Sequence, residues 1–190
     1  MIYGRKTWGP KAWHLLQVFA INQNKKISNN KKHNYYIFYT SFIYILPCLQ
    51  CSQHYSDIIN YINPIIEEDI NRKYLIRWIF DVHNIVNSFL NKPQYNFEKY
   101  LENNKNILNN DILFIIDSIF NNFNYNNMSL HKFDQIVNFF FNFCLLYPDL
   151  KIRKKLKKII KKNNFDKIET PLQFEQWFKN NFSEIKNILT

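Results

Sequence analysis

The residues best suited to chemistry in this 190-residue chain are Cys48 and Cys51, which are separated by two residues in the segment LPCLQCSQHY. Two thiols at this spacing can close into an easily reduced disulfide, or can ligate a metal ion together. The chain has one further cysteine, Cys144, so three cysteines are too few for a scaffold of structural disulfides. The pair therefore predicts either thiol–disulfide exchange or metal binding.

The residues around the pair predict a helix that begins at the cysteines. Proline is favoured in the first turn of a helix, so Pro47 places Cys48 near a helix N-terminus. The positive end of the helix dipole stabilises a thiolate there. We therefore expect Cys48 to be exposed and readily ionised, as thiol exchange with a substrate requires. We expect Cys51, almost one turn further along the helix, to lie on the side that faces the protein interior.

Two other segments have apolar residues at helical spacing, one on either side of the cysteine pair. In the second of them, His83 and Asn87 are one turn apart, so their side chains are neighbours that could hold a flat polar ligand. The alternative for His83 is a histidine whose hydrogen bonds are satisfied within the core. The apolar faces comprise Trp13, Leu16 and Ala20 in the first segment and Leu75, Ile79, Val82 and Val86 in the second.

Three ordered blocks of sequence resemble the Erv/ALR family of FAD-linked sulfhydryl oxidases. They are WGPKAW at residues 8–13, PCLQCSQHY at 47–55 and WIFDVHNIVNSFLNKP at 78–93. The resemblance covers roughly residues 5–100, and it depends on the order and spacing of the blocks as well as on their identities. Within the family, the chain resembles the compact members of large DNA viruses, which lack additional cysteines.

The resemblance implies a function and a set of site residues. A protein dithiol would attack Cys48, and Cys51 would face the flavin of a bound FAD, which passes electrons to O2 and yields H2O2. The substrate would be a separate dithiol protein, such as a small thioredoxin-like or CxxC-bearing partner. The implied cofactor-binding residues are Trp8, Gly9, Trp13, His83, Asn84, Val86, Asn87, Lys92 and Tyr95.

The chain departs from the family pattern at several positions. Many members have a histidine where this chain has Gln17, which puts one cofactor contact in doubt. Asn96 and Phe97 stand where a cysteine of a second, stapling pair often follows, and the chain has no second CxxC to act as a shuttle. Cys144 lies in an apolar run and is expected to be a buried hydrophobic residue.

The helical spacing of the apolar residues and the family resemblance imply an all-α fold, and the composition permits it. Only Gly4 and Gly9 are glycines, which argues against glycine-rich nucleotide loops and against tight-turned β structure, so a flavin would be held by helix side chains. We expect a small helical bundle of the Erv/ALR type at residues 1–102 as the FAD-binding oxidase domain. A helical C-terminal region of unknown role would follow at 103–190, with helices near 112–120, 130–146, 150–160 and 172–189.

A basic run at residues 151–162 carries eight of the positive charges and accounts for most of the formal net charge of +10. Its apolar residues recur at helical spacing, which predicts an amphipathic helix with a cationic face. That face is either simply solvated or contacts an anionic partner, a nucleic acid or a membrane surface, between Lys151 and Lys162. The C-terminal region could also form a homodimer.

No apolar stretch reaches the length that spans a bilayer, and no secretory signal opens the sequence. We therefore expect a protein without a transmembrane segment, in the cytoplasm of an infected cell or in the virion if the source is viral, and otherwise soluble within the cell. Two rival functions use the same cysteines. A zinc module would combine Cys48, Cys51 and His54 with a distant ligand such as His83, and a thioredoxin-like reductase would need a βαβ context.

Overall fold

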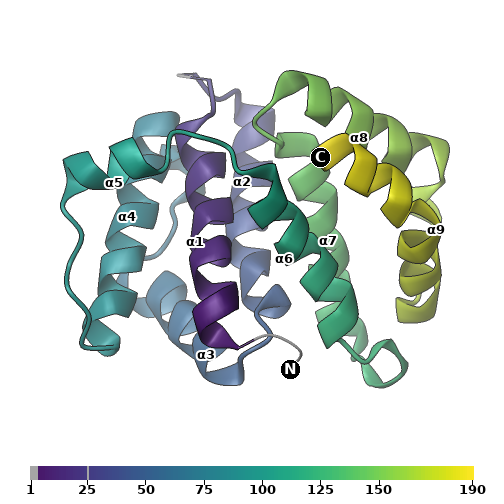
Figure 1. Cartoon of the computed structure of the whole chain (residues 1–190), viewed down its shortest axis with the longest axis horizontal. Coiled ribbons are helices and arrows are strands. Elements are labelled where there is room, and N and C mark those ends of the chain that lie inside the picture. Colours follow the sequence, from purple (N-terminus) through teal and green to yellow (C-terminus); the bar gives the residue numbers. More distant parts are fainter. Residues whose placement is uncertain (1–3, 25) are drawn as a thin grey trace.

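The computed structural model describes residues 4–24 and 26–190, and this part of the chain contains nine α-helices and no strand (Figure 1). The predicted all-α fold is confirmed. The helices are α1 (Arg5–Ile21), α2 (Asn29–Ser41), α3 (Leu49–Asp57), α4 (Arg72–Phe89), α5 (Phe97–Asn103), α6 (Asn109–Asn122), α7 (Leu130–Leu146), α8 (Leu150–Lys162) and α9 (Pro171–Leu189). A 3-10 turn, η1 (Phe42–Ile45), continues α2, and a π-helical turn, η2 (Ile58–Ile62), continues α3.

Side-chain caps explain where several helices begin. The Asn71 side chain accepts a hydrogen bond from the Tyr74 backbone N–H at 3.0 Å and so starts α4. Thr170 and Gln173 form a reciprocal capping box at the start of α9, with Pro171 at its first position. The four helices predicted beyond residue 103 are present as α6 to α9, and the bounds of α7 agree with the prediction.

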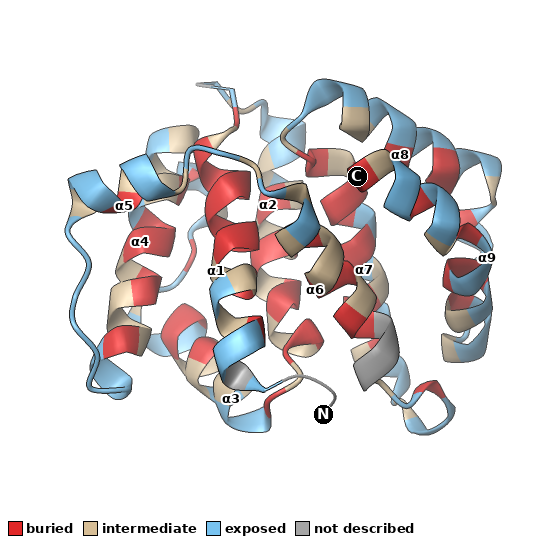
Figure 2. Cartoon of the chain, in the orientation of Figure 1, coloured by how far each residue is buried: buried red, intermediate tan, exposed pale blue. Residues whose placement is uncertain are grey.

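Helix α1 lies at the centre of the molecule, with α4 packed on one side and α6 on the other, while α2 packs against α7 (Figure 1). Buried residues line the sides on which these helices face one another (Figure 2). The buried aromatic rings of Phe19 on α1 and Phe38 on α2 stack at 4.5 Å, and both contact α7 through Phe143 and Phe139. One hydrophobic core therefore extends through both halves of the described chain.

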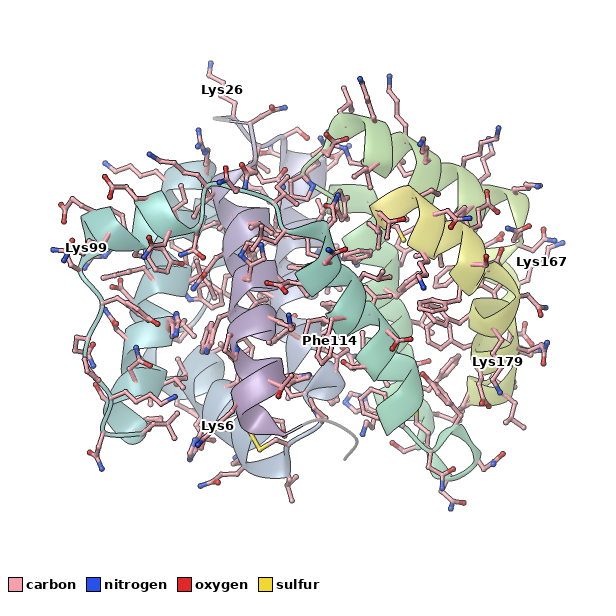
Figure 3. The ribbon with its side chains drawn as sticks, viewed as in Figure 1. Lys6, Lys26, Lys99, Phe114, Lys167 and Lys179 are labelled. Atoms are coloured by element: carbon pink, nitrogen blue, oxygen red, sulfur yellow. A yellow bond between two sulfur atoms is a disulfide. The ribbon has the colours of Figure 1, made fainter. Side chains whose placement is uncertain are left out.

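Polar contacts also join the second half to α1. The side chains of Lys11 and Asp111 form an ion pair, and Nε2 of buried His14 accepts a hydrogen bond from the Leu108 backbone N–H at 3.1 Å. Phe114 faces α1 from α6, with the Lys11 ammonium 5.2 Å from its ring centre (Figure 3). Helix α5 runs across the predicted boundary at residue 102, so the division into two domains stays a prediction. Within the described residues, no helix combines the length and apolar character needed to cross a membrane.

Candidate active site

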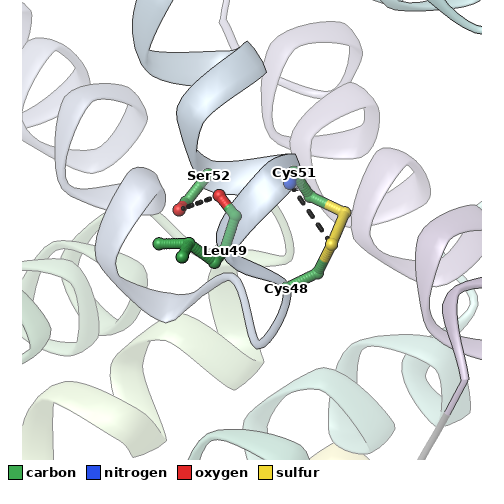
Figure 4. Close-up of a disulfide and its surroundings, with 4 residues drawn as sticks. All are labelled: Cys48, Leu49, Cys51 and Ser52. Carbon is green, nitrogen blue, oxygen red and sulfur yellow. Dashed lines mark hydrogen bonds between the residues drawn. A yellow bond between two sulfur atoms is a disulfide. The ribbon is translucent and has the colours of Figure 1, made fainter.

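The two cysteines of the CxxC segment form a disulfide at the start of α3, with their Cα atoms 5.1 Å apart (Figure 4). Cys48 is the N-cap of the helix, and its sulfur accepts a hydrogen bond from the Cys51 backbone N–H at 3.2 Å. The predicted position of Cys48 at a helix N-terminus agrees with this geometry. The placement of Pro47 in the first turn is wrong, because Pro47 precedes the N-cap and Leu46 before it is extended, as residues before proline tend to be.

The two sulfur-bearing residues have different surroundings. Cys51 is half-buried and lines a cavity, whereas Cys48 does not line it and is only 8% exposed. The expected exposure of Cys48 is therefore not observed, because its side chain folds back over the first turn of α3. The next residue, Leu49, is 84% exposed, so the chain reaches the molecular surface directly after Cys48.

The cavity beside Cys51 has a volume of about 740 Å³, within the range typical of small-molecule and cofactor sites. It lies between α1, α3 and α4 and the segment that follows α4. Eight of the nine residues predicted to bind a cofactor line it, and the ninth, Asn84, does not. The eight are Trp8, Gly9, Trp13, His83, Val86, Asn87, Lys92 and Tyr95.

Three aromatic side chains from separate parts of the chain meet in this cavity. The ring of His83 on α4 stacks on Trp13 of α1, with centroids 4.1 Å apart and planes 10° apart. Tyr95 approaches the same imidazole at a tilt, with a centroid distance of 4.8 Å. The three rings together give the cavity an aromatic wall, and aromatic rings favour contact with a planar heterocycle.

Gln17 fixes the orientation of His83. The Gln17 Nε2 atom lies 2.9 Å from His83 Nδ1, and both residues are buried. Burial, together with repulsion from Lys92, lowers the pKa of His83 to about 3, so the imidazole is neutral at physiological pH. The ring of His83 is thus hydrogen-bonded within the core and also lines the cavity, so the two predicted roles do not exclude each other, and contact with a cofactor stays a prediction.

Asn84 positions the segment that closes the cavity after α4. Its Oδ1 accepts a hydrogen bond from the Tyr95 backbone N–H at 2.8 Å, and its Nδ2 donates to the Tyr95 carbonyl at 3.3 Å. The chain reverses direction at Asn91, whose φ of 50° is left-handed, and the Lys92 N–H bonds the Asn87 carbonyl at 2.8 Å. This Schellman-type ending returns Lys92 and Tyr95 to the cavity wall.

The polar groups of the cavity fit a flavin nucleotide. The indole N–H of Trp8 is buried in the cavity wall and has no hydrogen-bond partner among the described residues. Such a donor costs about 1–3 kcal/mol unless a ligand acceptor meets it. A Cβ atom added at Gly9 would meet nothing within 4 Å, so the wall there is open rather than packed with protein. The cations of Lys6 and Lys92 line the same cavity and could face phosphate oxygens.

Several cavity residues were not predicted as cofactor contacts. His54 lies one turn after Cys51 on α3, so helical spacing could have indicated it, and its ring meets Phe89 at 5.4 Å. Leu90 and Tyr100 join the wall from the end of α4 and from α5 through tertiary packing that no local pattern reports. Across residues 4–24 and 26–190 there is no group of three or more histidine, cysteine, aspartate or glutamate side chains that could hold a metal ion.

The fold and the site define the class: a helical protein with a CxxC disulfide beside an aromatic cavity. Comparison with known proteins gives the family. The Erv1 / Alr family pattern matches residues 10–105, so the chain belongs to the Erv1/Alr family and that prediction is confirmed. No solved structure matches the chain significantly.

Relatives from two viruses illustrate the match. A protein of Acanthamoeba polyphaga mimivirus, named a probable FAD-linked sulfhydryl oxidase, is 30% identical over 96 residues, which is 50% of this chain and 66% of the viral protein. The FAD-linked sulfhydryl oxidase of an African swine fever virus isolate is 32% identical over 110 residues, covering 58% of this chain and 87% of its own length. The family match ends at residue 105, before α6 to α9.

Proposed function

We propose that the protein is an FAD-linked sulfhydryl oxidase that converts pairs of protein thiols to disulfides, reduces O2 and releases H2O2. One observation carries the proposal most directly. Cys51 of the Cys48–Cys51 disulfide lines the same cavity as eight of the nine predicted cofactor residues. The family and the names of its viral members support FAD as the cofactor and thiol oxidation as the reaction.

Different cavity residues would bind different parts of the cofactor. Trp13, His83 and Tyr95 supply a stacking surface, and the Trp8 indole supplies a hydrogen-bond donor. Neutral His83 keeps this surface uncharged, while Lys6 and Lys92 supply positive charge for phosphates. When bound, FAD accepts the electron pair of two thiols and passes it to oxygen.

The residues of the CxxC segment carry the thiol exchange. A substrate thiolate attacks Cys48 Sγ, the Cys48–Cys51 bond breaks, and Cys51 leaves as a thiolate at the cavity wall. The second substrate thiol, after losing its proton to solvent, attacks the substrate sulfur of the mixed disulfide and expels Cys48 as a thiolate. The substrate leaves as a disulfide, and its two electrons remain on the cysteine pair.

The geometry at the start of α3 favours the second step. The Cys51 backbone N–H that points at Cys48 Sγ stabilises negative charge there, as does the positive end of the helix. A better leaving group accelerates thiol–disulfide exchange.

The setting of the reaction is proposed on the same family basis. The substrate is a separate dithiol protein, because Cys144, the one cysteine outside the pair, is fully buried in α7 and burial raises its pKa well above the ordinary range. The relatives named above are viral proteins, which favours the cytoplasm of an infected cell or the virus particle as the location.

Single cysteine variants test the function. Cys48→Ser and Cys51→Ser should each abolish oxygen consumption with a small dithiol while the purified protein keeps the yellow absorption of bound flavin. Cys144→Ser is the matched control and should retain turnover. Colourless wild-type protein containing stoichiometric zinc would overturn the proposal in favour of a metal module, and turnover in either active-pair variant would remove the proposed exchange pathway.

A further inference from the structure

Helix α8 carries a concentration of positive charge that the oxidase site does not use. Its thirteen residues contain seven lysines and one arginine, and no acidic residue. All seven lysines are exposed, and within the described chain none of them forms an ion pair with a carboxylate. Figure 2 shows the outer side of α8 as exposed surface at the edge of the molecule.

The charge extends onto a neighbouring helix. Partial burial lowers the pKa of Lys31 on α2, and repulsion from the nearby Arg153 and Lys157 of α8 lowers it further. Like charges three or four residues apart on a helix each cost a few tenths of a kcal/mol, and nothing acidic in α8 offsets them. A surface formed by α8 and Lys31 is therefore organised to receive negative charge from outside the chain.

The packing of α8 indicates which anionic partner fits. Its apolar residues Leu156, Ile159 and Ile160 are buried against the rest of the molecule, chiefly α7 and α9. Leu150, at the first position of α8, is exposed, but a single side chain does not make the continuous apolar face that amphipathic membrane helices insert into a membrane interface. It also contains no aromatic residue on which an unpaired base could stack. The surface of α8 therefore offers cationic side chains without a continuous apolar face or aromatic rings, and such a surface fits a regular array of phosphate groups.

We propose that the basic surface of α8, with Lys31, binds the phosphate backbone of duplex nucleic acid without sequence specificity. The helix is about 20 Å long at 1.5 Å per residue, whereas duplex DNA carries one charge per ~1.7 Å of its axis, so several lysines can meet phosphates at once. The surface lies outside residues 10–105 that match the family, and it does not depend on the oxidase activity.

The test uses the full chain loaded with flavin and a labelled DNA duplex of about 20 base pairs, titrated between about 50 and 200 mM salt. The test variant changes Lys154, Lys155, Lys158 and Lys162 to Gln, which keeps helix propensity nearly constant. The matched control changes Lys73, Lys99, Lys105 and Lys186 to Gln. These four are also exposed but lie outside α8, so both variants lose the same charge.

The wild type and the control should bind with the same salt dependence, whereas the α8 variant should bind at least tenfold more weakly. For the α8 variant, the magnitude of the slope of log affinity against log salt concentration should fall by about 3–4, close to one unit per lost phosphate contact. All three proteins should keep the flavin absorption, which excludes a folding defect. Equal binding by both variants would overturn the proposal, as would wild-type binding to vesicles containing phosphatidylserine without binding to DNA.

Discussion

In the proposed mechanism the two sulfur atoms of the Cys48–Cys51 disulfide have separate tasks, and removing one of them should isolate an intermediate. In Cys51→Ser, the Cys48 thiolate can attack the disulfide of an oxidised partner protein. One partner sulfur then stays bonded to Cys48, the other leaves as a thiolate, and Cys51 is no longer available to displace the adduct. We expect a mixed disulfide on a non-reducing gel, absent when both cysteines are replaced. A partner captured equally well through Cys144 would contradict the proposed pathway.

The neutral state of buried His83 should make stability depend on pH in a defined direction. Its pKa is about 3 in the folded protein and about 6.5 when exposed, so below pH 6.5 the unfolded chain binds a proton that the folded chain does not. The contribution of neutral His83 to the free energy of unfolding is therefore complete above pH 6.5 and is lost as the pH falls toward 3. Between pH 6.5 and 5 the free energy of unfolding should drop by about 1–2 kcal/mol from this residue alone.

Denaturant unfolding of the wild type and of His83→Gln isolates this effect. The other titrating groups are common to both proteins, including His14, whose pKa burial also lowers. The difference in unfolding free energy between the two proteins should therefore shrink between pH 7 and pH 5. Parallel pH profiles would show that the imidazole is not held neutral in the folded protein.

At the scale of elements, the segment between α4 and α5 is held by side-chain bonds more than by its own packing. Tyr95 is 47% exposed, and its backbone is fixed by both polar atoms of the Asn84 amide. Asn84→Ala should lower the unfolding free energy by about 1 kcal/mol. It should weaken flavin binding several-fold, because Tyr95 is no longer held against His83. Calorimetric titration of the flavin-depleted protein measures this, with Asn106→Ala in the linker before α6 as the control. Unchanged affinity would show that Asn84 does not position the cavity wall.

Local sequence signals predict the elements of this fold better than the contacts between them. The periodicity and the turn residues that predict α7 and α9 act over a few residues, and the structure has these helices at the expected positions. Eight of the predicted cofactor residues converge on one cavity because their sequence blocks lie on α1, α4 and the turn after α4. The bonds of Asn84 to Tyr95 and of His14 to Leu108 depend on how distant segments meet, so no local pattern indicates them.

At the scale of the whole molecule, α6 and α7 cover apolar faces of α1 and α2. Ending the chain after Asn104 would expose Phe19 and Phe38, which are fully buried in the complete protein. Exposing a large buried side chain forfeits about 1.5–3 kcal/mol, and many such side chains would be exposed together. We expect the truncated chain to aggregate or to lose cooperative thermal unfolding, as judged by calorimetry and flavin content. A soluble, yellow fragment with an unchanged melting temperature would instead show that the chain up to Asn104 folds as an independent domain.

The position of Trp8 and Trp13 in the cavity wall gives the protein a built-in optical reporter. Two of the four tryptophans of the chain line the site, and one of them is stacked on His83. Flavins absorb in the spectral region where tryptophan emits, so excitation energy passes from these indoles to a bound flavin. The intrinsic ultraviolet fluorescence of the protein therefore dims as the cavity fills, which allows cofactor loading to be followed in real time without a label.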